Sequence, residues 1–293
     1  MKSNRITSKY IELLKSSLLN NIYIENEMRI IHVIIQMASG GGLNYVDFFN
    51  IAKMRAKDID NLRLCKLNGD TLNIVLKDAQ GKFVNTQDFR NITELSHTMI
   101  GRKRLDNIQF CVETILEDGI QGDFIETGIW RGGACIFMQG LLEAYGATDR
   151  TLWAADSFEG VPPPTWKEDE GFDISARVLP VLAVSLDEVK ELFCRYDLLG
   201  DNIKFLKGWF KDTLPTANIE KLALLRLDGD LYESTMDALV PLYDKVVSGG
   251  FIIVDDYGSC PPCKRAIEDF RRQRNIVEPL EVIDVQSVFW RKS

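Results

Sequence analysis

The stretch that decides the fold is DFIETGIWRGG, residues 123–133. It opens with a short apolar run at 123–127, and the glycine-containing turn that follows leads into an apolar stretch at 133–145 with helical periodicity. The glycines let a ligand approach the backbone closely, and the helix start offers it free N–H groups. The spacing matches neither G-x-G-x-x-G nor a Walker loop. Taken alone, the stretch fits a ligand-binding loop and an ordinary strand–helix connection equally well.

Short apolar runs and helical stretches alternate along the rest of the C-terminal two thirds. Further strands are predicted at 151–156, 203–206, 222–227 and 251–254. Helices are predicted at 105–116, 184–196, 234–246 and 263–273, and Ser185 with Glu188 forms a capping box for the second of them. A hairpin over 280–284 and 288–291 closes the chain. This alternation indicates a parallel α/β sheet with helices on both faces.

The N-terminal third has a different pattern, and the chain divides near residue 95. We expect a mainly helical N-terminal extension or cap over residues 1–95 and the α/β domain over residues 96–293. The extension is predicted to contain an amphipathic helix, an apolar helix, a glycine break and a short hairpin: 10–19, 28–37, 39–42, and 72–76 with 82–84.

Composition excludes several classes of protein. A net charge of −8 argues against general nucleic-acid binding, which needs a basic face. No stretch approaches the ~20 apolar residues of a membrane span, and the N-terminus lacks the apolar core of a signal peptide. Six scattered cysteines fit a reducing cytosol, so we expect a cytoplasmic protein. Only two histidines are present, so any metal site must rely on carboxylates, which favours Mg²⁺, Ca²⁺ or Mn²⁺.

Acidic residues end four of the expected strands: Glu126, Asp156, Asp228 with Asp230, and Asp255 with Asp256. In parallel sheets, ligands bind at the carboxyl ends of the strands, where the strand order reverses. A carboxylate at the end of a buried strand is more often functional than structural, and four agreeing strand ends strengthen this interpretation.

Asp156 follows Glu126 by one strand–helix–strand unit. A carboxylate at this place suits the two hydroxyls of a ribose, although it also suits an N-cap for the segment that follows. A ribose site without a pyrophosphate-binding fingerprint favours S-adenosylmethionine over NAD.

Asp228, with Asp230 close behind it, precedes Asp255 and Asp256 by one strand–helix–strand unit, which is 27 residues from Asp228 to Asp255. Adjacent parallel strands would bring these four carboxylates together, where they repel one another unless a cation neutralises them. Oxygen ligands match Mg²⁺. The competing interpretation is that these residues are separate caps and surface turns.

Other motifs carry weaker signals. Cys260 and Cys263 have C-x-x-C spacing, but no second pair accompanies them, which disfavours a zinc or redox site. The basic residues at 101–104 are interpreted as a solvated helix start that could also attract a carboxylate. Trp209 and Phe210 could stack on an adenine or belong to the core, and we expect both histidines to be structural.

Six ordered motifs resemble the macrocin O-methyltransferase family, which acts on deoxysugars of natural products. They lie at 98–107, 126–133, 156–161, 208–215, 227–235 and 249–257. The resemblance covers roughly residues 85–293 and 10–26. It implies a class I methyltransferase (Rossmann-like) fold with a seven-stranded, mostly parallel sheet, S-adenosylmethionine as methyl donor, Mg²⁺, a small-molecule hydroxyl acceptor and a homodimer or higher oligomer.

The resemblance also assigns roles to individual residues. It implies that Asp228, Asp255 and Asp256 are metal ligands and that Asp230 is the general base. Its implied cofactor contacts are Glu126, Thr127, Gly128, Ile129, Trp130, Asp156 and Ser157, with Met99, Trp209 and Phe210 flanking the cofactor. Residues 161–183 resemble an active-site lid, and residues 28–84 have no match.

The sequence is compatible with several functions. The main hypothesis is Mg²⁺-dependent methylation of a sugar hydroxyl, in which coordination lowers the hydroxyl pKa and Asp230 takes the proton. The same chemistry on a phenol or catechol needs less help from the metal because a phenol has a pKa near 10. Two further hypotheses are a cofactor-binding protein without catalysis and an NAD-dependent sugar enzyme.

Overall fold

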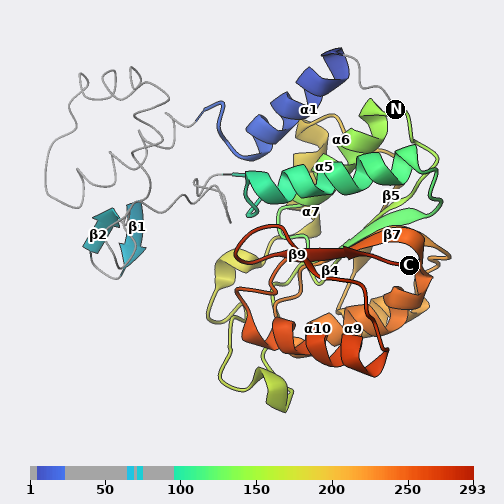
Figure 1. Ribbon diagram of the computed structural model, residues 1–293. Helices are drawn as coiled ribbons and strands as arrows, with labels where there is room; N and C mark the ends of the chain where they lie inside the picture. Colours follow the sequence, from blue (N-terminus) through green and yellow to red (C-terminus); the bar gives the residue numbers. More distant parts are fainter. Residues whose placement is uncertain (1–4, 24–64, 69–70, 75–95) are drawn as a thin grey trace, which may run out of the picture.

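The computed structural model describes residues 5–23, 65–68, 71–74 and 96–293 of the chain. Seven strands form a central sheet in the order β5-β4-β3-β6-β7-β9-β8 (Figure 1). Their bounds are Asp123–Thr127 (β3), Leu152–Asp156 (β4), Ile203–Lys207 (β5), Leu222–Leu227 (β6), Val246–Val254 (β7), Glu281–Val282 (β8) and Val288–Arg291 (β9). Strands β3 to β7 pair in parallel, whereas β9 pairs antiparallel with both β7 and β8. The expected seven-stranded, mostly parallel sheet is confirmed.

Helices cover both faces of this sheet because the buried strands are apolar on both sides. Phe124 and Leu224 point into one core cluster, and their neighbours Ile125 and Leu225 point into the other. The first core takes in α1 (Arg5–Leu18), α5 (Arg102–Glu117), α6 (Gly133–Ala144) and α7 (Leu186–Arg195). The second takes in α9 (Tyr232–Leu242) and α10 (Pro261–Gln273), and the short α8 (Phe210–Thr213) packs against it. Figure 1 shows these two layers above and below the sheet.

The strand order reverses between β3 and β6. From β3 the chain runs through α6, β4 and α7 to β5 in one direction, and β6 then lies on the other side of β3. The loops that leave β3 and β6 therefore diverge at the carboxyl edge of the sheet, which is where α/β folds bind ligands.

Gly128 allows these two loops to pass close together. It has φ of +84°, and a Cβ atom at this position would lie 1.7 Å from the carbonyl oxygen of Asp228. The Asp228 N–H donates to the Thr127 carbonyl at 2.9 Å, so the two chain segments are held in direct contact. Only glycine fits here without moving the backbone.

Most expected elements match the structure, and the differences have local causes. Ser185 and Glu188 form the predicted capping box of α7. The helix predicted at 234–246 instead spans Tyr232–Leu242, followed by a 3₁₀ turn at Tyr243–Lys245. Strand β7 begins five residues earlier than expected, because Val246 already pairs with Leu222 of β6 before a shift of register that apolar patterning does not reveal.

The N-terminal third is described only in part. Helix α1 covers the first expected helix, and its buried residues Ile11, Leu14 and Leu18 belong to the same core as the sheet. Strands β1 (Cys65–Asn68) and β2 (Thr71–Ile74) form an antiparallel hairpin. Its second strand overlaps the expected arm at 72–76. The expected helix at 28–37, the glycine break at 39–42 and the arm at 82–84 lie outside the described residues. Among the described residues, no helix has the length and apolarity to cross a bilayer.

We predict that Gly128→Ala lowers the free energy of unfolding by more than about 3 kcal/mol or prevents folding, because the new methyl group meets backbone rather than a side chain. Urea denaturation of the purified variant measures this loss. Gly119→Ala is the matched control, since Gly119 has φ of +66° but open space around it, so only the left-handed backbone costs about 1–2 kcal/mol. Equal losses in the two variants would contradict the close-approach argument.

Candidate active site

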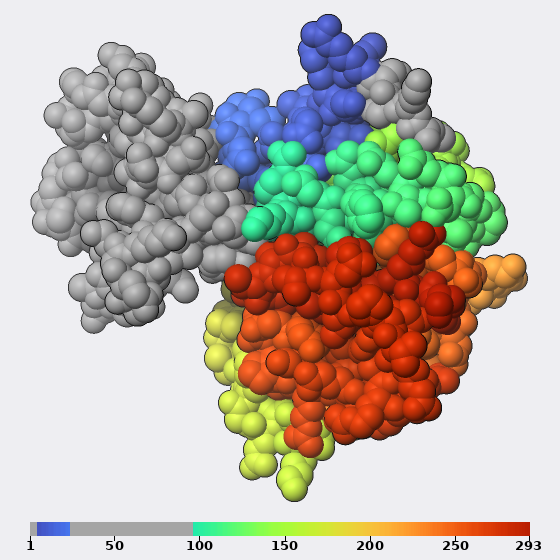
Figure 2. All heavy atoms as spheres, viewed as in Figure 1, coloured from blue at the N-terminus to red at the C-terminus, as the bar shows by residue number. Residues whose placement is uncertain are grey.

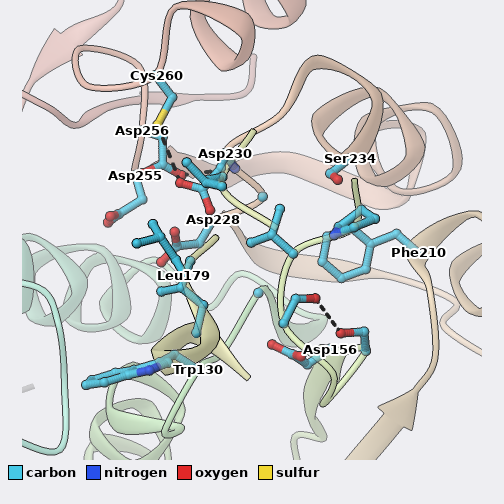
Figure 3. A pocket seen from close by; sticks show the side chains of 18 of the residues that line it. Trp130, Asp156, Leu179, Phe210, Asp228, Asp230, Ser234, Asp255, Asp256 and Cys260 are labelled. Atoms are coloured by element: carbon cyan, nitrogen blue, oxygen red, sulfur yellow. Dashed lines mark hydrogen bonds between the residues drawn. The ribbon is translucent and has the colours of Figure 1, made fainter. Parts of the chain in front are cut away.

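A cavity of about 920 Å³ opens at the carboxyl edge of the sheet, at the reversal of strand order. Figure 3 shows its two ends. Asp228, Asp230, Asp255 and Asp256 line one end, which we call the acidic end. Trp130, Asp156, Trp209 and Phe210 line the other, the aromatic end. A volume near the upper limit of small-molecule pockets is large enough for a cofactor and a second ligand side by side.

The acidic end forms because β6 and β7 are adjacent and in register. Leu227 pairs with Val254, so the residues that follow each of them lie next to one another. One carboxylate oxygen from each of Asp228, Asp255 and Asp256 lies within 4.8 Å of the others. The Asp230 N–H donates to Asp256 Oδ2 at 3.3 Å. The structure thus brings together the four carboxylates that the sequence places on either side of one strand–helix–strand unit.

Two buried arginines hold this cluster in place. Arg226, near the end of β6, donates to Glu126, to Asp228 at 2.8 Å and to Asp255. Arg104, at the start of α5, donates to the other oxygen of Asp255 and to Asp284 at 2.8 Å. In the described part of the chain, Asp256 has no such arginine or lysine partner.

Sequence patterns missed Arg226, and they gave carboxylate binding by residues 101–104 only as the alternative interpretation. Arg226 is 1% exposed, and the available signal was an arginine inside the apolar run 222–227. For residues 101–104, the expectation of a solvated helix start is wrong at Arg104, which is 5% exposed and binds carboxylates. Arg102 does lie at the surface, where it binds Glu12 and Asp106.

Burial and mutual repulsion make the acidic end hold protons tightly when no cation is present. Both effects raise the pKa of Asp228 and Asp256. Burial, together with the charge of Asp228, raises the pKa of Asp230 to about 7. Burial also raises the pKa of Glu126 to about 7, although Arg226 opposes that shift. Carboxylates in this state are suited to a divalent cation, which would replace the protons.

Cys260 also belongs to the acidic end, a placement that its C-x-x-C motif did not predict. Its thiol donates to Asp230 Oδ1 at 3.4 Å, and burial beside Asp256 raises the pKa of the thiol. Cys260 and Cys263 are both free thiols. A neutral thiol in this position acts as a weak hydrogen-bond donor to the carboxylate.

At the aromatic end, Asp156 holds two loops together. Its carboxylate accepts the Ile129 N–H at 2.8 Å and the Phe158 N–H at 2.6 Å. Trp130 has φ of +48°, a left-handed conformation that turns the chain away from β3. Asp156 therefore caps a turn, and because each carboxylate oxygen has two lone pairs it can also accept hydrogen bonds from a ligand in the cavity.

The expected cofactor contacts fall into two groups. Those that line the cavity are Met99, Gly128, Trp130, Asp156, Ser157, Trp209 and Phe210. Three others, Glu126, Thr127 and Ile129, are at most 4% exposed and lie behind the cavity wall. Glu126 is paired there with Arg226 and accepts the Cys135 thiol at 2.8 Å. In this position Glu126 supports the site from behind.

Residues 161–183, which we call the lid segment, form one wall of the cavity. Eight apolar side chains of this segment face the space: Val161, Pro162, Pro163, Phe172, Ile174, Leu179, Val181 and Leu182. The Trp130 indole donates to the Val181 carbonyl at 2.9 Å, which ties the lid segment to the aromatic end.

Comparison with known proteins relates this geometry to a family. A family model described as macrocin O-methyltransferase matches residues 7–292. The solved structure of the O-methyltransferase NovP is similar to this chain, with a TM-score of 0.75 and 38% sequence identity. The alignment covers 98% of this chain and 99% of the NovP chain. The calicheamicin methyltransferase CalS11 covers 64% of this chain and is itself covered to 78%, with a TM-score of 0.51 and 17% identity, a likeness of fold.

Curated relatives match a shorter part of the chain. Demethyldecarbamoylnovobiocin O-methyltransferase of Streptomyces niveus is 52% identical over 176 residues, which cover 57% of this chain and 65% of that protein. Mycinamicin III 3''-O-methyltransferase of Micromonospora griseorubida is 49% identical over 173 residues, which cover 57% of this chain and 67% of that protein. The matched segments thus span about two thirds of the length of these relatives.

We predict that Mg²⁺ stabilises the protein more as the pH rises from 5.5 to 8. Above about pH 4 the unfolded chain has released protons that the folded protein still holds, because burial raises the pKa values of Asp230 and Glu126 to about 7. Without metal, the free energy of unfolding therefore falls as the pH rises through about 7. A cation must displace those protons, and its stabilising effect therefore grows over the same window. Thermal unfolding with Mg²⁺ and with chelator measures the difference, about 2–4 °C per kcal/mol for domains of ~150–250 residues. An equal effect at both pH values would contradict this expectation.

We predict that Arg226→Met lowers the free energy of unfolding by about 3–5 kcal/mol, because the buried carboxylates of Glu126 and Asp255 lose the guanidinium that pairs with them. Adding Glu126→Gln removes one of those charges and is expected to restore part of the loss. Chemical denaturation of both variants measures the recovery. A double variant no more stable than Arg226→Met would show that the Glu126 charge does not depend on Arg226.

Proposed function

We propose that this chain, which belongs to the macrocin O-methyltransferase family, transfers a methyl group from S-adenosylmethionine to a sugar hydroxyl of a glycosylated natural product. The observation that carries this proposal is one cavity that joins a cluster of carboxylates to an aromatic end with an acidic strand terminus. The first end suits an acceptor with neighbouring oxygens, and the second suits an adenosyl group.

Residues of the aromatic end would bind the methyl donor. Asp156 lies at the end of β4, where its carboxylate can accept hydrogen bonds from ribose hydroxyls. Trp209 and Phe210 line the cavity at the start of α8 and offer aromatic faces to an adenine. Gly128 has no side chain, so a ligand can lie directly against the backbone between β3 and β6.

Residues of the acidic end would carry out proton transfer. As the acceptor oxygen forms its bond to the methyl carbon, the methyl–sulfur bond breaks and the sulfonium becomes a neutral thioether. Asp230 takes the hydroxyl proton in the same reaction. Burial raises the pKa of Asp230 above that of a free aspartate, which is near 3.9, and so makes its carboxylate a stronger base. The Asp256 carboxylate accepts the Asp230 N–H, which holds the base in place.

The donor set of the acidic end fits Mg²⁺. Asp228, Asp255 and Asp256 supply carboxylate oxygens, and their repulsion makes a divalent cation favourable. Asp256 is the most available of the three, because Arg226 and Arg104 already occupy both oxygens of Asp255. When bound, the cation would lower the pKa of an acceptor hydroxyl and orient it.

The charge of the cavity supports an acceptor without phosphate groups. Seven carboxylates line it, from Asp156 to Asp256, against two basic side chains, Arg104 and Lys211. Arg104 is engaged by Asp255 and Asp284. A nucleotide-activated sugar would bring a diphosphate into this field, whereas a sugar joined to an apolar aglycone would place that aglycone against the apolar side chains of the lid segment. On this proposal, glycosyl transfer precedes methylation.

The acidic end also bears on the competing functions. A binding protein without catalysis has no evident need for four buried carboxylates beside a cofactor pocket. A phenol or catechol acceptor would use the same residues, and its lower hydroxyl pKa would leave residual turnover in chelator. Acceptor assays with and without Mg²⁺ therefore separate the sugar from the phenol.

The first test is calorimetric titration of S-adenosylmethionine into the protein, followed by assays of methyl transfer detected by mass spectrometry. Demethylated novobiocin-type and mycinamicin-type glycosides serve as acceptors, beside a nucleotide-linked deoxysugar and a catechol. We expect the donor to bind with or without Mg²⁺. Of the acceptors, we expect only a glycoside to be methylated, and only when Mg²⁺ is present. Absence of donor binding would overturn the methyltransferase proposal, and methylation of the nucleotide-linked sugar would overturn the proposed order of reactions.

Site variants then divide the roles. We predict that Asp230→Asn lowers kcat by about 10²–10⁴-fold while donor binding and stabilisation by Mg²⁺ persist, since a base acts only in the chemical step. Asp256→Asn is expected to remove both turnover and the stabilisation by Mg²⁺. Asp212→Asn, an exposed carboxylate outside the cavity, is the control and should change neither. Wild-type kcat in Asp230→Asn would remove this residue from the mechanism.

A further inference from the structure

Helix α9 begins immediately after the loop that carries Asp228 and Asp230, and it does not cap itself. Its own N-cap residue is Leu231, whose side chain offers no acceptor. Asp169 of the lid segment supplies the cap instead. Its Oδ1 accepts the Tyr232 N–H at 2.6 Å, and its Oδ2 accepts the Glu233 N–H at 3.1 Å. A negative charge at a helix start is also favoured by the helix dipole.

The Asp169 side chain is completely buried, with 0% exposure. A buried carboxylate is costly unless its oxygens are bound, and the first turn of α9 provides both partners. The main chain of Asp169 also accepts the Phe172 N–H at 3.0 Å, and Phe172 lines the cavity. One residue therefore connects the wall of the acceptor space to the start of α9.

Neighbouring residues of the lid segment strengthen this attachment. Thr165 Oγ1 donates to Glu233, and the Trp166 ring lies 5.8 Å from the Tyr232 ring, centroid to centroid. Glu168 lies 3.6 Å from Arg265 of α10.

A second attachment of the lid segment is the hydrogen bond from Trp130 to Val181, at the aromatic end. The lid segment is thus attached at both ends of the cavity. Figure 2 shows the outer surface of this part of the chain in yellow-green, beside the orange and red surface of the C-terminal elements.

The position of α9 bears directly on Asp230. Only Leu231 separates Asp230 from the capped residue Tyr232, and Asp230 itself has the left-handed φ of +57°. The Leu231 N–H donates to the Gly229 carbonyl at 2.5 Å, which makes the loop from 228 to 232 tight. In so short a connection, a shift in the start of α9 moves Asp230.

We infer that Asp169 is a positioning residue for methyl transfer: its buried carboxylate caps α9 and so fastens the lid segment to the loop that holds Asp228 and Asp230. This inference rests on the proposed function of that loop. It means that closing the wall of the acceptor space and placing the base are one event. The acceptor is enclosed only when Asp230 is in position, and water is excluded at the same moment.

The test compares four variants by amide hydrogen exchange of the full chain. Asp169→Ala removes both hydrogen bonds, and Asp169→Asn keeps one acceptor oxygen and serves as the conservative variant. Asp173→Asn is the matched control within the lid segment, because that exposed carboxylate accepts only from Ser175 nearby. Val240→Gly destabilises α9 at an exposed position about two turns beyond its capped start.

We expect Asp169→Ala to speed exchange at least about tenfold in both 162–176 and 228–235, with a smaller effect in Asp169→Asn. Asp173→Asn should leave both regions unchanged, and Val240→Gly should affect α9 alone. Wild-type exchange in either region of Asp169→Ala would overturn the inference. These results do not depend on any acceptor, so they decide the attachment even if the chain transfers no methyl group.

Kinetics then test the positioning role. Asp169→Ala should lower kcat as well as raise the acceptor KM, for a loss of about 10²-fold in kcat/KM, because displacement of a reacting group by about 1 Å costs that much. Asp169→Asn should recover part of kcat. Val240→Gly, with a comparable loss of thermal stability, should keep the wild-type kcat. If kcat were unchanged in Asp169→Ala, or if Val240→Gly lowered kcat by the same factor, Asp169 would have a structural role only. A wild-type chain inactive toward every acceptor would instead count against the proposed function.

Discussion

The burial of carboxylates at the ends of β6 and β7 is the constraint on which the rest of the site depends. Six acidic side chains form one cluster with Arg226 and Arg104: Glu126, Asp228, Asp255 and Asp284, which pair with the arginines, and Asp230 and Asp256 beside them. Two guanidinium groups cannot neutralise six carboxylates, so protons or a cation must supply the remaining positive charge. Asp255 shows the arrangement most clearly, because each of its oxygens accepts from a different arginine. The arginines orient the cluster, and its excess of negative charge is the basis of the proposed cation site.

Much of this architecture follows from the sequence because parallel sheets obey simple rules. The apolar runs at 123–127 and 222–227 coincide with β3 and β6, and the acidic residues after β6 and β7 meet as adjacent strands require. The cavity then lies where the order of strands reverses. These inferences depend on local periodicity and on one topological rule, and both hold for this chain.

The parts that sequence could not predict involve partners far apart in the chain. Arg104 pairs with residues more than 150 positions away, and a basic run at a helix start can suggest a carboxylate partner but not which one. Asp169 caps a helix 63 residues further on, so the usual search for a cap beside the helix fails at α9. Glu126 ends a buried strand as expected, yet Arg226 and Cys135 hold it behind the cavity wall. In each case the side chain's role is decided by tertiary packing.

The pairing of Arg104 with Asp284 has a consequence for synthesis of the protein. The two residues are 180 positions apart, and Ser287, near Asp284, donates to the Asp255 carbonyl at 2.5 Å. At about 5–20 residues per second, a ribosome needs roughly 10–40 s to travel from one to the other. During that time the start of α5 has emerged with a guanidinium whose carboxylate partners have not yet been made. The acidic end of the cavity is therefore completed last, and a chain that stalls before residue 284 holds the proposed donor-binding end without a finished acidic end.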